Sequence, residues 1–385
     1  MNYSYKMRIY FVRKDHGGVN LISYHLLKKE EIWLVRKMMV SSNWTSVEEF
    51  VLLGFGIGPH SRLLLLIFFT ILYVLTLVEN ITIIILVLLD THLGQLPMYI
   101  LLSNFSWLEM CYVSTTVPRM LFDLAVPGGI ISFNECFIQF YIFFSLGCTE
   151  CFFLSTMALD RYVAICRPLH YPHIMSHSFC YLMVALCWIV GFLWYLVPAK
   201  LISKLSFCAA NVIDHFLCDP GPILSLACPP LGKAPIFSQI CLNGLLIGNI
   251  SFVVASYSTV IFTLAKTSDS LRKGFSTISF HLIVVSLFYG SVAAMYLLPG
   301  GESQLGVTKA VTLFYTAITP FLNPLIYCLR NNQVKEALGR LLTRKVITCI
   351  LNFTWKHTIN RCSSQRRKAH AHHFPLHSGS TDASK

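Results

Sequence analysis

Three glutamates stand inside long apolar segments of this sequence: Glu79, Glu109 and Glu150. A charged side chain at the centre of a bilayer costs about 2.5–3.5 kcal/mol on insertion scales, so acids that are kept there need an explanation. The predicted polar cluster in the interior of a helix bundle comprises Asn80, Glu109, Glu150 and Asn323. It has two interpretations, which the sequence leaves open. The cluster binds a sodium ion, or its acids are protonated and hold helices together through hydrogen bonds.

A second group with chemical potential is an acid and a base in adjacent positions, Asp160-Arg161, followed by Tyr162. They stand near the end of a very long apolar segment. An arginine that is paired at the end of a helix can be released when helices move apart, which makes the pair a candidate switch.

Four of the fourteen cysteines fall near one predicted outer loop, namely Cys136, Cys208, Cys218 and Cys228. Four cysteines permit three pairings, and the spacing does not choose among them. A metal site there is disfavoured because His215 is the only histidine nearby. The sequence also has no phosphate-binding glycine loop, no H-E-x-x-H and no nucleophile elbow, so we predict no enzyme activity, no cofactor and no metal.

The segments that carry these residues are those of a membrane protein. Of the 385 residues 55% are hydrophobic and 12% charged, with a mean hydropathy of +0.61, which excludes a soluble globular domain of this size. A spanning helix needs about 20 mostly apolar residues. Seven segments qualify: 63–89, 97–121, 136–166, 179–201, 236–265, 275–298 and 305–329.

Charge and modification patterns indicate the orientation. Short loops on one side and the region from Lys335 to Lys385 are basic, which favours a cytosolic location for that side. Asn43-Trp44-Thr45 is a glycan acceptor that is useful only on the opposite side. The basic ends are expected to meet membrane lipid or solvent and not nucleic acid, because they are not interleaved with aromatic residues. Residues 1–37 show no cleavable signal peptide.

The residues around the Asp160-Arg161 pair carry a resemblance to a known family. Met157 to Cys166 followed by Pro168-Leu169-His170-Tyr171 resembles the signature of odorant receptors in the rhodopsin-like G-protein-coupled class. Other stretches similar to that family occur in order over residues 43 to about 342: Phe50 to Phe55, Pro97-Met98-Tyr99, Ser256-Tyr257, Lys273 to Thr277 with His281, Phe288-Tyr289-Gly290, and Pro320 to Tyr327. Each is common alone, but the ordered set is specific.

The sequence departs from the family pattern in a few places. Glu79 stands where the family has glycine, Gly94-Gln95-Leu96 replaces Leu-His-Thr, and Ile278 and Phe280 replace small residues. One residue turns a helical side chain by about 100°, so Glu79 is expected to face lipid or another helix and not the side of Asn80. This puts folding and surface delivery in question.

The resemblance implies an all-α fold, a bundle of seven transmembrane helices with a short cytosolic helix after the seventh span. It implies an extracellular tail over 1–60 and a receptor domain over 61–330. The mixed, basic residues 1–37 are expected to be an upstream extension before Met38 or Met39. An amphipathic cytosolic helix over 331–342 and a disordered basic tail over 343–385 follow. The protein is expected in the plasma membrane with its amino terminus outside.

The resemblance also implies the site residues. For a small hydrophobic volatile they are Phe143, Phe144, Gly147, Leu245, Val292, Tyr296 and Thr316. For activation of a stimulatory G protein that raises cyclic AMP they are Asp160, Arg161, Tyr162, Tyr257, Asn323, Pro324 and Tyr327. The implied disulfides pair Cys136 with Cys218 and Cys208 with Cys228. Two alternatives are an ion-coupled transporter lined by the membrane acids and a receptor of this fold that no longer signals.

Overall fold

The computed structural model describes residues 47–126, 129–207, 211–266, 271–297, 305–329, 333–341 and 343. Asn43 and Cys208 lie outside this part, and the side chains of Tyr296 and Tyr327 are not described. The chain divides into two units, Met1–Arg330 and Asn331–Lys385. In the second unit residues 333–341 form a helix.

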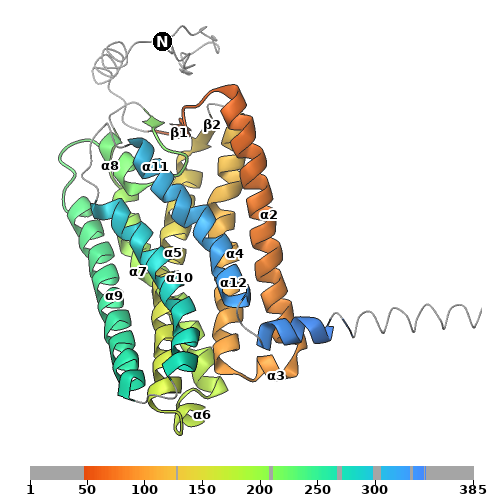
Figure 1. Ribbon diagram of the computed structural model, residues 1–385. Coiled ribbons are helices and arrows are strands. Elements are labelled where there is room, and N and C mark those ends of the chain that lie inside the picture. The colour runs from red at the N-terminus through yellow and green to blue at the C-terminus, as the bar shows by residue number, and fades with distance from the viewer. Residues whose placement is uncertain are drawn as a thin grey trace, which may run out of the picture. The chain divides into compact units, whose positions relative to one another are not determined.

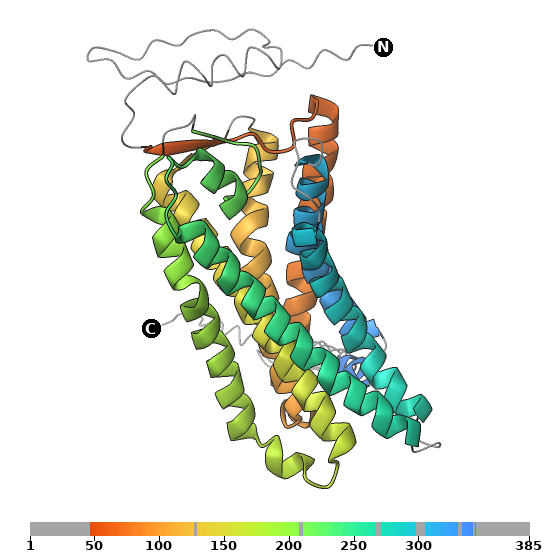
Figure 2. The ribbon, with the colours of Figure 1, turned by 90° about the vertical axis from the view of Figure 1, so that its left-hand side faces the viewer.

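The first unit is a bundle of long helices that run roughly along one direction (Figures 1 and 2). This confirms the predicted seven-helix architecture. The spans are α2 (Pro59–Leu89), α4 (Pro97–Ala125), α5 (Phe133–Cys166), α7 (His177–Ser203), α9 (Ala234–Lys266), α10 (Leu271–Leu297) and a composite seventh span. Among the described residues, α2, α5, α7 and α9 are each long and apolar enough to cross a membrane. With 31 residues, α2 is about 46 Å long, against a hydrocarbon core of about 30 Å.

Helix α5 is the centre of the bundle, because it packs against α4, α7 and α9. In its most apolar stretch 72% of the residues are buried, compared with 28% in the corresponding stretches of α7 and α9. A capping box fixes its first turn, in which the Ser132 side chain and the Glu135 backbone and carboxylate satisfy each other. Residues of both predicted sites, from Phe143 to Arg161, therefore lie on one fixed helix.

The seventh span is not the single helix that the sequence predicts. It consists of α11 (Leu305–Leu313), a π-helical turn η2 (Phe314–Ile318) and α12 (Thr319–Leu329). Pro320 and Pro324 have no backbone N–H, so two bonds of the regular helical ladder cannot form near this point. The Thr319 hydroxyl instead donates to the Phe314 carbonyl at 3.3 Å. Such π-helical turns often occur at functional sites.

A small sheet lies at the end of the bundle from which α5 starts. Its strands are β2 (Gly129–Ser132), β1 (Glu49–Leu52) and β3 (Val212–Ile213), in that order. Strand β1 pairs antiparallel with β2 and parallel with β3. The sequence predicts only a tail before residue 60, and strands of two to four residues are too short to show a period. Phe50 of β1 is fully buried, with its ring centroid 6.0 Å from that of Phe133 and 5.8 Å from that of Phe207.

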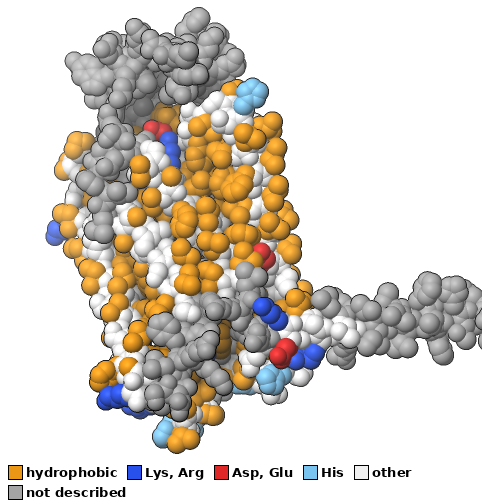
Figure 3. All heavy atoms as spheres, in the orientation of Figure 1, with side chains coloured by type: hydrophobic (Ala, Val, Ile, Leu, Met, Phe, Trp, Pro, Cys, Tyr) orange, Lys and Arg blue, Asp and Glu red, His pale blue; other side chains and the backbone are white. Residues whose placement is uncertain are grey.

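Three short helices connect the spans: α3 (Thr91–Gly94), α6 (Tyr171–Ile174) and α8 (Pro220–Leu226). Asp90 begins α3 by accepting hydrogen bonds from the backbone of His92 and Leu93. Between the ends of the bundle, the surface in Figure 3 is mostly hydrophobic. Large apolar side chains such as Leu64, Leu88 and Ile240 are more than 60% exposed, as expected for a lipid-facing surface.

Candidate functional site

The acid and base at the end of α5 form an ion pair. Arg161 donates to the Asp160 carboxylate, and Asp160 is 1% exposed. The Tyr171 hydroxyl, on α6, donates to the other carboxylate oxygen of Asp160 at 2.8 Å. Asp160 is thus held by the first residue of α6 as well as by Arg161 of its own helix. Tyr162, the next residue, is half-buried.

Beside this pair a tyrosine and a histidine join two other helices. Tyr257 of α9 and His281 of α10 share a buried hydrogen bond, and both lie within electrostatic range of Arg161. His281 was quoted in a family stretch but was not predicted as a site residue. This hydrogen bond joins α9 to α10 next to Arg161, so it would break if the two helices moved apart.

One of the interior acids, Glu109, contacts a side-chain amide directly. Asn323 of α12 donates to Glu109 of α4, and both side chains are buried. Glu150 of α5 is 2% exposed and is an electrostatic neighbour of Glu109. Asn80 of α2 is equally buried, and its amide donates to the Thr76 carbonyl at 2.9 Å. Pro324 follows Asn323 inside α12 and is buried.

Several oxygens of this interior have no hydrogen-bond partner within the described part of the chain. They are Asn80 Oδ1, Glu109 Oε2 and Asn323 Oδ1. Buried polar atoms are nearly always satisfied, so these oxygens call for water or a cation. Glu79 differs from them: it is half-buried, although its Oε2 also lacks a described partner. The different exposure of Glu79 and Asn80 agrees with the predicted change of face.

The predicted pocket residues of α5 lie in a cluster of aromatic rings. Phe143 stacks on Tyr112 of α4, with centroids 4.9 Å apart, and lies 6.1 Å from Tyr315 of η2. Phe144 stacks on Tyr195 of α7 at 4.8 Å. All five rings are buried.

Gly147 opens towards the same cluster. A Cβ atom added there would lie 3.8 Å from the Tyr112 ring, which is ordinary contact, so the glycine leaves side-chain space against that tyrosine. Leu245 of α9 and Thr316 of η2 are buried, and Val292 of α10 is half-buried. The position of the Tyr296 side chain is not described.

Sequence reasoning missed three members of the cluster: Tyr112, Tyr195 and Tyr315. They stand on spans whose outward faces are as apolar as their inward faces, so a periodic pattern does not separate the two. The tyrosine hydroxyls were a usable signal, because a buried phenol needs a polar partner. The hydroxyl of Tyr195, for example, lies 3.3 Å from that of Ser238 on α9.

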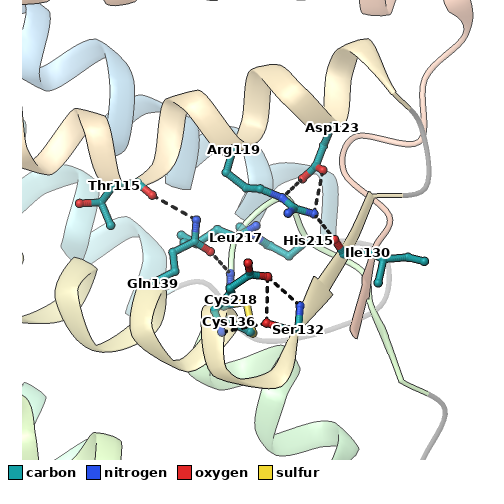
Figure 4. The surroundings of a disulfide bond; sticks show 11 residues. Thr115, Arg119, Asp123, Ile130, Ser132, Cys136, Gln139, His215, Leu217 and Cys218 are labelled. Carbon is teal, nitrogen blue, oxygen red and sulfur yellow. Dashed lines mark hydrogen bonds and ion pairs between the residues drawn. A yellow bond between two sulfur atoms is a disulfide. The ribbon is translucent and has the colours of Figure 1, made fainter. Parts of the chain in front are cut away.

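A disulfide fixes the loop between α7 and α9 over this end of the bundle. The described residues of that loop, which contain β3, Cys218 and α8, are called the cover below. Cys136 of α5 is bonded to Cys218, and both are fully buried (Figure 4). Gln139, one turn along α5, donates to the Thr115 carbonyl of α4 at 3.1 Å and accepts from the Cys218 backbone at 3.3 Å. Cys228 is also disulfide-bonded, whereas Cys208 lies outside the described residues, so their pairing stays a prediction.

An ion pair also fastens the cover to the seventh span. Lys309 of α11 donates to Asp214 at 2.5 Å and to the Gly54 carbonyl at 2.7 Å. The next loop residue, His215, stacks on Phe216 and accepts from the Leu217 backbone through Nδ1. The amino-terminal segment, the loop before α8 and the seventh span are therefore joined at one point.

Two loop residues should give this cover opposite pH dependences. Burial, with a smaller effect of the nearby Lys309, lowers the pKa of His215 from 6.5 to about 3. As pH falls below 6.5 the unfolded chain takes up a proton that the folded protein does not, so the folded protein loses stability. Burial raises the pKa of Asp219, which begins α8, from 3.8 to about 6, so stability rises as pH falls through 6. Between pH 7 and pH 5 we expect a loss of about 2 kcal/mol from His215 and a gain of about 1 kcal/mol from Asp219.

Single substitutions should separate these two effects. Relative to the unsubstituted chain, His215→Asn should become more stable at pH 5 than at pH 7, and Asp219→Asn less stable. Asparagine keeps an acceptor at both positions. The measurement is the thermal unfolding midpoint of the purified protein in lipid nanodiscs at the two pH values. Changes in the same direction for both variants would contradict the assignment.

Comparisons with known proteins agree with this arrangement. A family model described as "Olfactory receptor" matches residues 69–345. The human protein "Olfactory receptor 11H6" is 52% identical over 301 residues, which is 77% of this chain and 90% of that protein. Human "Olfactory receptor 11G2" is 45% identical over 345 residues, 86% of this chain and 99% of that protein.

The fold also matches a solved structure. The crystal structure of squid rhodopsin superposes with a TM-score of 0.59 at 18% identity, over 76% of this chain and 88% of that one. At this identity the match concerns the fold alone. The comparisons do not support the ion-coupled transporter considered above.

Proposed function

Because the chain belongs to the olfactory receptor family, and is therefore a multi-pass odorant receptor that couples to a G protein and not an enzyme, we propose where its ligand binds and which G protein it activates. The ligand is a small, uncharged, hydrophobic volatile. It occupies the outer half of the bundle, among Phe143, Phe144, Gly147, Leu245, Val292, Tyr296 and Thr316.

The aromatic cluster around Gly147 is the observation that carries this proposal. Phe143, Phe144 and Tyr112 offer apolar ring faces, and the buried hydroxyl of Thr316 offers one polar contact. Ligand sites of this kind are mostly apolar, with a few polar groups that fix orientation. The disulfide between Cys136 and Cys218 holds the loop before α8 against α5 at this end of the bundle.

The disulfide chemistry supports one orientation in the membrane. Disulfides form on the oxidising side of a membrane, so the end with Cys136 and Cys218 faces the exterior. Arg161 lies 25 residues further along α5, about 38 Å away, and so faces the cytosol. This orientation supports an amino terminus outside, with a glycan on Asn43, and we propose the plasma membrane as the location, where the basic carboxyl-terminal tail meets anionic lipid.

Signalling is a population shift in this scheme. An odorant that binds the active arrangement more tightly favours outward movement of α10 and loss of the Arg161 to Asp160 ion pair. The inner face around Arg161, Tyr162, Tyr257 and Tyr327 then receives a stimulatory G protein of the olfactory type, and cyclic AMP rises.

Filling the pocket tests the ligand site. We expect Gly147→Leu to lower odorant potency at least tenfold, because the added side chain takes the space against Tyr112. The assay exposes cells to a panel of volatile alcohols, aldehydes and ketones and reads cyclic AMP, with surface receptor counted by antibody. Gly244→Leu, at an exposed glycine of α9 with open space around it, is the matched control. Equal potency for both variants would place the ligand elsewhere.

The interior oxygens support a sodium site. Glu109 Oε2, Asn80 Oδ1 and Asn323 Oδ1 are acceptors without a described partner, and hard cations prefer such oxygens. Sodium would hold the inactive arrangement, so replacing external and internal sodium with N-methyl-D-glucamine should raise odorant potency about threefold to tenfold. Glu109→Gln should abolish this dependence. A sodium-independent potency in the unsubstituted receptor would favour the purely structural network.

A further inference from the structure

A groove on the lipid-facing side of the bundle lies outside the ligand site described above. It is formed where α5, α7 and α9 meet, the helices of the face shown in Figure 2, and has a volume of about 280 Å³. Its lining is Phe152, Ser155, Thr156, Leu159, Met183, Leu186, Cys187, Val190, Gly248, Asn249 and Phe252. Of the residues assigned to the odorant, none belongs to this set.

The rim of the groove is apolar and open to the membrane. Leu186 of α7 is 42% exposed and Phe252 of α9 is 43% exposed, and Gly248 on the same face of α9 is also exposed. Thr156 lies ten residues before the end of α5, and Cys187 ten residues after the start of α7, so both are about 15 Å from those helix ends. With α5 about 51 Å and α7 about 40 Å long, spans centred on a hydrocarbon core about 30 Å thick place these two residues about 5–10 Å inside that core.

The floor of the groove is polar. Ser155 donates to Asn249 Oδ1 at 2.6 Å, and one amide hydrogen of Asn249 is used on the Leu245 carbonyl at 2.8 Å. A primary amide has two donors, and within the described part of the chain the second has no partner. An unmatched N–H in hydrocarbon is costly, so an occupant with an acceptor oxygen is favoured over one without.

Depth narrows the chemistry of the occupant. Lipid headgroups and the hydroxyl of a membrane sterol stay at the interface, and acyl chains at this depth carry no acceptor. A volume of about 280 Å³ holds on the order of ten non-hydrogen atoms, taking about 30 Å³ for each water-sized group. A small molecule that dissolves in the bilayer and carries an acceptor oxygen meets both requirements, the size of the groove and an oxygen at this depth.

We propose that this groove is a second binding site, reached from the membrane, for a small lipid-soluble molecule with one hydroxyl or carbonyl oxygen that accepts from Asn249. The site is separate from the odorant pocket. Because Asn249 precedes Tyr257 by two turns of α9 and Ser155 precedes Arg161 on α5, an occupant bridges two helices that carry the activation residues.

Photolabelling of the full-length receptor in native membranes tests the site. The probe is a ten-carbon alcohol with a photoreactive diazirine and an alkyne tag, and labelled peptides are located by mass spectrometry. We expect label in residues 148–159 and 246–252. Gly248→Leu should reduce that label at least fivefold, because its side chain fills the groove while all hydrogen bonds of the floor remain. Asn249→Leu should reduce it similarly.

Matched controls separate the site from its alternatives. Gly244 is one helical turn from Gly248, is also exposed and has open space around it, but it does not line the groove, so Gly244→Leu should leave the label unchanged. Gly147→Leu, in the odorant pocket, should also leave it unchanged, and a loss there would overturn the proposal. Equal label in Gly248→Leu and the unsubstituted receptor would indicate bulk lipid contact only. Equal label from the matching decane probe would show that the floor recognises no oxygen.

Discussion

Replacing Arg161 with alanine should reduce odorant-evoked cyclic AMP to background while leaving receptor at the cell surface. In the structure Arg161 is paired with Asp160 and lies near Tyr257 and His281, where α9 and α10 meet. Once the pair opens, the guanidinium is the only strong charged donor among these four side chains. Hydrogen bonds to a charged group contribute about 1.5–3 kcal/mol each, or about tenfold to a hundredfold in an equilibrium.

The same geometry predicts the opposite effect for the partner. Asp160→Asn removes the charge that holds Arg161, so cyclic AMP without odorant should rise. Arg167→Ala is the matched control, because Arg167 is an exposed arginine six residues along at the same end of the bundle. A wild-type response in Arg161→Ala would remove the pair from the mechanism. An unchanged basal signal in Asp160→Asn would show that the pair does not hold the inactive arrangement.

The sequence predicts the spans well, for a physical reason. A backbone in hydrocarbon must satisfy its own hydrogen bonds, so a long apolar run has one structural outcome, and the predicted run 97–121 corresponds to α4 (Pro97–Ala125). Rare acids and amides in such runs are equally informative. Glu109 and Asn323 are 214 residues apart in sequence, and the structure brings them into contact.

What the sequence does not predict are the details that depend on packing between helices. Lipid and protein interior are both apolar, so the apolar pattern does not separate Tyr112, which stacks on Phe143, from Trp107 on the same helix, which is 55% exposed. The strand Glu49–Leu52 gains its conformation from two partner segments far along the chain. The π-helical turn Phe314–Ile318 interrupts a span that the apolar pattern predicts as one regular helix.

Loss of the disulfide between Cys136 and Cys218 should be the most damaging change to folding. The bond links residues 82 positions apart, and closing a loop of that length removes about 4.5 kcal/mol of chain entropy from the unfolded state at 25 °C. We expect Cys136→Ser and Cys218→Ser each to reduce surface receptor at least tenfold, measured by antibody on intact cells. Cys241→Ser, at a half-buried free cysteine of α9, should leave surface delivery unchanged.

The double variant makes this expectation sharper. If the two sulfurs act only as one bond, Cys136→Ser with Cys218→Ser should lose no more surface receptor than either single variant, because the second change removes nothing further. An additive loss would mean that each thiol site contributes by packing, since both are fully buried. Gln139 also ties the Cys218 backbone to α4 through Thr115, so Gln139→Leu should weaken the same cover while leaving the disulfide intact. The cover then depends on two features. The disulfide limits the conformations of the unfolded chain, and the Gln139 side chain positions the Cys218 backbone in the folded protein.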